Sequence, residues 1–125
     1  MNEFLADIRE RTRQLQEHNK AWTCEFSNLM TYQNLGMTEE KNGNLLDAEN
    51  AYIECVEYGE HSELMKIHNY AYSIERLAII YRKQKRYTDE VNILKVAFKH
   101  KDFTSAKLGN RLKKAIELEL KTKSM

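Results

Sequence analysis

The chain has 125 residues, of which 42% are hydrophobic and 31% are charged. This length suits one domain with a single core, and the hydrophobic fraction excludes a disordered chain. The formal net charge of +1 hides an uneven distribution, because residues 25–63 carry a net charge of −8 and residues 82–125 a net charge of +8. Asymmetry of this kind bears on binding partners and not on fold.

The sequence contains no proline and only four glycines. No position therefore forces a helix to break, and few positions favour tight hairpin turns. The first twenty residues are too charged for a signal peptide, and no apolar run approaches the roughly 18 residues of a membrane span. We expect an all-α, soluble, cytoplasmic protein with no membrane partner, in which Cys24 and Cys55 are reduced thiols.

Helical spacing of apolar residues begins near the N-terminus and predicts a helix over residues 3–17. The spacing continues from Ala21 to Lys41, interrupted by the polar stretch TYQN, as one long helix or two abutting helices. The stretch KNGN, residues 41–44, is the clearest turn signal, because Asn and Gly tolerate the left-handed conformation that ends a helix. A further apolar stripe runs from Leu45 to Tyr58 and stops at Gly59, which completes a helical hairpin.

Residues 60–68 are ambiguous and have room for a short helical turn. A second hairpin follows, with one apolar stripe from Tyr70 or Tyr72 to Tyr81 and another from Val91 to Phe98. The last helix is predicted over residues 103–121, with Asp102 as its cap.

The two hairpins align without a gap at an offset of 42 residues. Leu35 then matches Leu77, and Gly36 matches Ala78. The other aligned pairs are Leu45 with Tyr87, Tyr52 with Leu94, and Cys55 with Ala97. Each copy places a small residue where a second helix must approach closely and bulky residues where a groove must be filled.

This order resembles the tetratricopeptide repeat, which has a period of about 34 residues. The first copy matches its pattern at Leu35, Gly36, Ala48, Tyr52 and Cys55, and the second at Leu77, Ala78, Tyr81, Tyr87, Leu94 and Ala97. Glu39 stands where the family often has Tyr, Glu90 where it has Ala, and the consensus Pro is absent. The offset exceeds the period of the family, so residues 60–68 read as an insertion. The stretch ERLAIIYRKQKRY is similar to the second repeat of small bacterial proteins of this class.

The resemblance implies a right-handed stack of antiparallel helix hairpins, a tetratricopeptide-like α-solenoid, forming one domain over residues 1–125. The repeats are expected over residues 29–59 and 71–100. Two repeats alone do not bury a continuous core. We therefore expect an N-terminal helix to cover the open face of the first hairpin and the helix over residues 103–121 to cover the second, about six helices in all.

In this family the inner face of each first helix usually binds an extended peptide. The corresponding positions are Met30, Gln33, Met37, Glu40, Tyr72, Glu75, Ile79 and Arg82. They do not supply the Lys, Asn and Arg set with which one subset of the family clamps a C-terminal carboxylate. An apolar peptide or helix is the expected ligand, and the alternative is that Met30, Met37 and Ile79 contact neighbouring helices instead.

A basic cluster lies at the turn of the second hairpin and consists of Arg82, Lys83, Lys85 and Arg86. Positive charge there complements the carbonyl end of a helix dipole, so a solvated turn is the favoured interpretation. The alternative is a partner-binding patch that includes Arg82, Lys83 and Arg86. A nucleic-acid site is less favoured, because no helix-turn-helix or zinc-finger motif is present.

The sequence shows no catalytic or cofactor motif. His61 and His68 are too far apart for a recognisable metal site, and no glycine-rich phosphate loop or serine elbow occurs. We expect a non-enzymatic adaptor, without cofactor or metal, that binds a protein or peptide through the groove and its charged flanks. The alternatives are a nucleic-acid accessory protein that uses the basic C-terminal half, or a small inhibitor of a larger complex. The oppositely charged halves also allow a homodimer.

Overall fold

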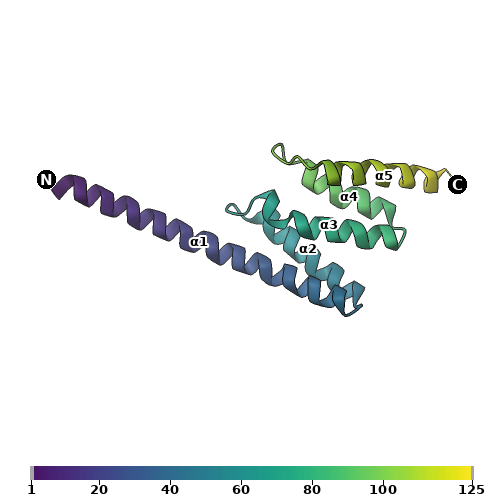
Figure 1. Ribbon diagram of the computed structural model, residues 1–125, viewed down its shortest axis with the longest axis horizontal. Helices are drawn as coiled ribbons and strands as arrows, with labels where there is room; N and C mark the ends of the chain where they lie inside the picture. The colour runs from purple at the N-terminus through teal and green to yellow at the C-terminus, as the bar shows by residue number, and fades with distance from the viewer. Residues whose placement is uncertain (1, 125) are drawn as a thin grey trace.

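The computed structural model describes residues 2–124, so the ends of the domain predicted over residues 1–125 lie outside the described part. Within that part the chain forms five helices and no strand, which confirms the all-α class (Figure 1). The helices are α1 (Asn2–Lys41), α2 (Leu45–His61), α3 (Ile67–Lys83), α4 (Tyr87–Phe98) and α5 (Ala106–Lys123).

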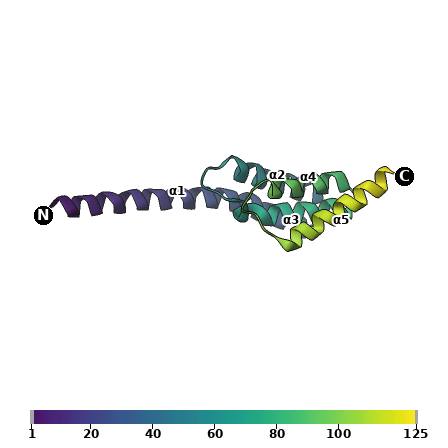
Figure 2. The same ribbon diagram turned by 90° about the horizontal axis from the view of Figure 1, so that it is seen from above.

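Each helix packs against the next along the chain, and α1 also contacts α3. Figure 2 shows α2 and α4 on one side of the molecule and α3 and α5 on the other, while the N-terminal half of α1 extends away from them. The body of the molecule therefore consists of α2 to α5 together with the C-terminal half of α1.

The hairpins α1–α2 and α3–α4 match at the helix ends that flank their turns. The first helix ends at Lys41 in one and Lys83 in the other, and the second helix begins at Leu45 and Tyr87, so both bounds are displaced by 42 residues. The intervening turns also match, because Gly43 (φ 81°) and Lys85 (φ 60°) both have left-handed backbones. The turn predicted at residues 41–44 is confirmed, and the basic cluster lies at the equivalent turn.

The core lies between these packed helices. Its largest fully buried side chains include Tyr52 and Tyr70 on either side of the α2–α3 connection and Leu77 and Leu94 in the second hairpin. α1 contributes fully buried Leu29, and α5 contributes Leu108 and Ala115. Both cysteines are free; Cys24 is exposed, whereas Cys55 belongs to the core.

The prediction that an N-terminal helix covers the first hairpin is wrong. Residues 3–17 are part of the 40-residue helix α1, and every described side chain before Trp22 is exposed. The reason is local: the chain has no proline and no glycine before Gly36, so nothing turns the N-terminal segment back onto the first hairpin. The described part consequently has five helices and not six.

Other expected bounds shift by a few residues. α2 continues past Gly59 to His61, and residues 62–66 connect it to α3. α5 begins at Ala106 instead of residue 103, because Ser105 is its cap: the Leu108 amide donates a hydrogen bond to Ser105 Oγ at 3.2 Å. A serine cap satisfies one of the free amides of the first turn.

Candidate interaction surfaces

Three of the predicted binding residues lie together in a depression between α1 and α3. Met37 and Glu40 from α1 and Tyr72 from α3 line it, and its volume is about 440 Å³. The other lining residues are Lys41, Tyr52 and Arg76. We call this depression the α1–α3 groove.

The floor of the α1–α3 groove is an ion pair between helices. Arg76 Nε donates a hydrogen bond to Glu40 Oε1 at 3.0 Å, and the Tyr52 hydroxyl donates to the same oxygen at 2.8 Å. The hydrogen bond from Arg76 holds the pKa of the Glu40 carboxyl below its ordinary value. Burial and the negative charge of Glu40 together raise the pKa of Tyr52. The Glu40–Arg76 pair therefore has no net charge. The floor is held by hydrogen bonds between side chains from three helices.

Apart from Lys41, the rim of the groove is apolar and accessible. Met37 and Tyr72 are each 42% exposed. Met30 and Gln33, which precede Met37 on α1, are half-buried and do not line the groove. Exposed thioether and aromatic groups above a rigid floor provide contact area for apolar side chains of a ligand.

Two other predicted residues of α3, Glu75 and Arg82, contact α5. Lys107 Nζ lies 2.8 Å from Glu75 Oε1, and Arg82 Nη2 donates a hydrogen bond to the Arg111 carbonyl oxygen at 2.9 Å. Ile79 lies between Glu75 and Arg82 on the same helical stripe and is half-buried. The predicted residues therefore do not form one surface: three line the α1–α3 groove, and two contact α5.

Arg82, the first member of the basic cluster, is part of a buried charge network. Glu90 is fully buried, and its Oε2 atom lies 2.8 Å from Arg82 Nη2 and 3.0 Å from Arg111 Nη1. A buried carboxylate is costly unless it is paired and hydrogen-bonded. The two arginines therefore connect α3, α4 and α5 through one carboxylate.

Arg86 also pairs with carboxylates. Its guanidinium lies 2.8 Å from both Glu49 Oε1 and Asp89 Oδ2, and its Cζ stands 4.5 Å from the centre of the Tyr81 ring. These carboxylates raise its pKa further above the ordinary range. Lys83, by contrast, is exposed. Two of the three cluster residues predicted to bind a partner thus hold helices together.

A third network joins α2 to the segment after α4. Glu60 Oε1 lies 2.5 Å from Lys99 Nζ, His100 Nε2 lies 2.6 Å from Glu60 Oε2, and the Tyr70 hydroxyl donates to the same carboxylate. Burial alone raises the pKa of Glu60, but the hydrogen bonds from Lys99, Tyr70 and His100 outweigh it and bring the pKa below its ordinary value. Sequence reasoning did not identify these residues, since nothing local links Glu60 to His100.

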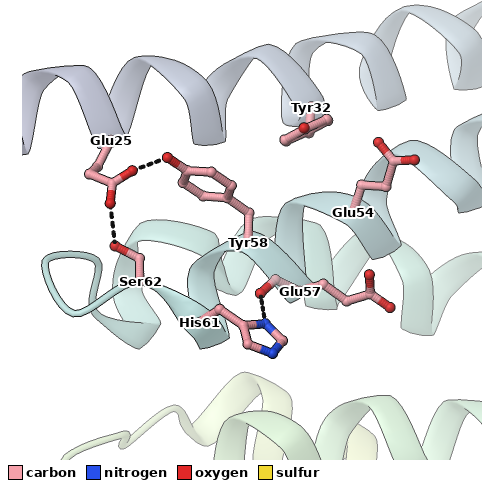
Figure 3. Close-up of a pocket in the computed structure, with 7 residues that line it drawn as sticks. All are labelled: Glu25, Tyr32, Glu54, Glu57, Tyr58, His61 and Ser62. Carbon is pink, nitrogen blue, oxygen red and sulfur yellow. Dashed lines mark hydrogen bonds between the residues drawn. The ribbon is translucent and has the colours of Figure 1, made fainter.

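An acidic depression of about 530 Å³ lies between α1 and α2 (Figure 3). Its lining residues are Glu25, Tyr32, Glu54, Glu57, Tyr58, His61 and Ser62. The sequence signal was the acidic run over residues 25–63, but the cluster forms only because α1 and α2 pack side by side. No residue of this depression was among the predicted binding residues.

The carboxylates of the acidic depression differ in their surroundings. Glu25 accepts hydrogen bonds from the Tyr58 hydroxyl and from Ser62 Oγ, the latter at 3.4 Å (Figure 3). Glu54 and Glu57 are exposed, and no salt bridge within residues 2–124 involves them. The lining of the depression therefore includes two accessible carboxylates and two tyrosine rings, an environment that attracts basic side chains.

No group of three or more His, Cys, Asp or Glu within residues 2–124 is placed to hold a metal ion. None of the helices in this part of the chain combines the length and apolarity that crossing a bilayer requires. No family model matches the chain, and neither the curated proteins nor the solved structures contain a match.

Proposed function

We propose that this protein is a non-enzymatic interaction module that binds an apolar segment of another protein in the α1–α3 groove. The observation that carries the proposal is the pairing of exposed Met37 and Tyr72 above the fixed Glu40–Arg76 floor. Because helices hold these groups, no backbone segment of the protein has to be ordered when a ligand binds.

The repeat pattern supports this proposal. The end of the first helix and the start of the second recur at 42 residues in the two hairpins, and the aligned residues Tyr52 and Leu94 are both fully buried. A stack of tetratricopeptide-like hairpins would place the first helices α1 and α3 on the surface that binds peptides in that family. The groove lies between those two helices.

The chemistry of the groove favours an extended peptide with apolar side chains. The Glu40–Arg76 pair leaves no unpaired acid on the floor, and Lys41 at the edge adds one positive charge. A nucleic acid is a weaker candidate, because Arg82, Arg86 and Arg111 of the basic half are already bound to carboxylates. Fewer bases then remain for phosphate contacts.

Affinity capture with the full chain tests the proposal. The variant Met37→Glu with Tyr72→Glu places two charges on the rim, and we expect it to lose protein partners that the native chain retains. The matched control is Leu46→Glu with Leu120→Glu, which changes two side chains that are 71% and 60% exposed outside the groove. Thermal unfolding of both variants establishes that each is folded.

Equal recovery of partners by the groove variant and the control would contradict binding in the groove. Binding of a labelled single strand or duplex at low ionic strength, lost as salt is added, would favour the nucleic-acid alternative instead.

A further inference from the structure

The N-terminal half of α1 carries an uncovered apolar stripe. Phe4, Leu5, Ile8 and Leu15 are 76%, 49%, 52% and 59% exposed. The same helix extends away from the body, and no other part of residues 2–124 packs on it (Figures 1 and 2). Most of the stability of a helix in a protein comes from packing of its apolar face, and this half of α1 has no such packing within residues 2–124.

The stripe has a seven-residue repeat. Ile8, Leu15, Trp22 and Leu29 recur at steps of seven, and a second row lies three residues before each of them. The second row is Leu5, Thr12, Asn19 and Phe26. Two rows offset in this way are the d and a positions of a coiled coil, respectively.

This stripe continues directly into the core. Leu29 is fully buried, and Trp22 and Phe26 pack against the core with their rings stacked at a centroid distance of 5.0 Å. The C-terminal part of the row is therefore already a helix-packing surface, covered by other helices of the chain. The N-terminal part of the stripe also carries apolar side chains, but no other helix of residues 2–124 packs on it.

The opposite face of the helix needs no partner. Arg13 pairs with Glu10 and with Glu17, the latter at 2.6 Å, on the outward side of α1. Residues 2–22 contain four acids and four Lys or Arg, so two copies of this segment do not repel each other through net charge.

We propose that the stripe from Leu5 to Trp22 is covered by the same stripe of a second copy of the chain, in a parallel two-stranded coiled coil. In a parallel, in-register pair, each Asn19 faces the second copy's Asn19 and each Thr12 faces Thr12. A polar Asn at an a position can hydrogen-bond across such a seam and fixes its register. Apolar layers then meet apolar layers at Leu5, Ile8 and Leu15.

The antiparallel pair that covers the whole stripe matches these layers poorly. When Leu5 is set against Trp22, Asn19 opposes Ile8 and Thr12 opposes Leu15. Each polar group would then be buried against an apolar side chain, at a cost in free energy. The flanking positions also suit the parallel arrangement, because Arg11 of one copy lies beside Gln16 of the other and like charges do not meet.

The coil must end near Trp22. α2 reaches the same part of α1, because Tyr58 and Ser62 donate hydrogen bonds to Glu25. The bodies of the two copies therefore begin where the coiled coil stops, and no residue that lines the α1–α3 groove belongs to the coiled coil. The proposal does not depend on what the groove binds.

Light scattering of the full chain over a range of concentrations tests the proposal. We expect a mass that reaches twice that of the single chain, and a monomer for Ile8→Glu with Leu15→Glu. The matched control, Ala6→Glu with Gln14→Glu, adds the same two charges off the stripe and should remain a dimer. A native chain that is monomeric throughout the range, or a dimer that both variants retain, would overturn the proposal.

A single cysteine tests the orientation. In a Cys24→Ser background, Leu5→Cys should give a disulfide-linked dimer under mild oxidation, because the two residues face each other in a parallel pair. In the antiparallel pair they would lie about 25 Å apart along the axis, from a rise of 1.5 Å per residue, and a disulfide cannot span that distance. A dimer in light scattering that forms no such link would contradict the parallel arrangement.

Discussion

The backbone of Gly36 lies directly against the ring of Tyr52, which packs on it from α2. A Cβ atom at residue 36 would stand 2.6 Å from Cδ1 and Cε1 of that ring. Gly59 has the same relationship to Tyr70, because an added Cβ atom would overlap Cδ1 of that ring. Because both rings are buried, neither can easily move aside. The two glycines therefore set the spacing of α1 and α2 and of α2 and α3.

We expect Gly36→Ala and Gly59→Ala each to lower the free energy of unfolding by about 1–3 kcal/mol, the usual cost of overpacking. Gly109→Ala is the matched control, because its nearest neighbour, Phe98 Cζ, would be 3.9 Å from the new methyl group. The control should stabilise the protein by up to about 1 kcal/mol through helix propensity. Urea unfolding followed by circular dichroism measures all three, and a Gly36→Ala variant at least as stable as the native chain would contradict the close packing.

Much of the fold could be predicted from the sequence, because its signals are local. The turn at residues 41–44, the matching turn at Lys85 and the small residue at Gly36 are each marked by neighbouring residue types. The length of α1 was not predictable in this way. An apolar stripe over residues 3–17 looks the same whether it covers the first hairpin or extends away from it.

The candidate surfaces were less predictable because they depend on pairs of residues far apart in sequence. Met37 and Tyr72 were identified from the repeat pattern, and the structure does place them in one groove. Arg82 and Arg86 gave no local sign that carboxylates on other helices would bind them. The fully buried Glu90 is the extreme case, since glutamate is rarely buried without a partner and Arg111 is 21 residues away.

Substitutions at Lys85 and Gly43, the equivalent positions of the two turns, should have opposite effects on stability. Lys85 has a left-handed backbone, which costs a non-glycine residue roughly 1–2 kcal/mol. Lys85→Gly should therefore stabilise the protein by up to about 1 kcal/mol, after the greater entropy of glycine in the unfolded chain is deducted. Gly43→Ala should destabilise it by about 1 kcal/mol. Thermal unfolding measures both, and a loss of stability in Lys85→Gly would argue against equivalent turns.

Removing the charge of Glu90 should strongly destabilise the protein. Glu90→Gln leaves the Arg82 and Arg111 guanidinium groups without their shared carboxylate, and breaking a buried ion pair costs about 3–5 kcal/mol. Glu117→Gln is the control, because Glu117 pairs with Lys114 at 3.6 Å on the surface. Its effect should stay within about 0.5 kcal/mol. Similar unfolding midpoints in urea for the two variants would show that the Glu90 network contributes little to the free energy of unfolding.

Stability should decline in acid partly through Glu40. Its pKa in the folded protein lies below the ordinary value of 4.5, chiefly because of the hydrogen bond from Arg76. A carboxyl with a lowered pKa contributes its full stabilisation above pH 4.5 and loses it as the pH falls through the folded pKa. We expect Glu40→Gln to be less stable than the native chain at pH 7 and to lose less stability on acidification.

Arg76→Gln provides the complementary test, because it removes the group that lowers the pKa of Glu40. It should likewise flatten the acid dependence of the free energy of unfolding, measured by urea titrations from pH 7 to pH 3. Curves for both variants that run parallel to that of the native chain would show that the pair does not govern acid stability.

The most direct test of peptide binding in the α1–α3 groove is site-specific photo-crosslinking. A photoreactive phenylalanine derivative at Tyr72 should form an adduct with a protein other than the chain itself, and Met37→Glu should abolish that adduct. The same group at Leu46, which is exposed on α2, should form none. Absence of an adduct at Tyr72, or equal adducts at both positions, would contradict the proposal that the groove is the binding site.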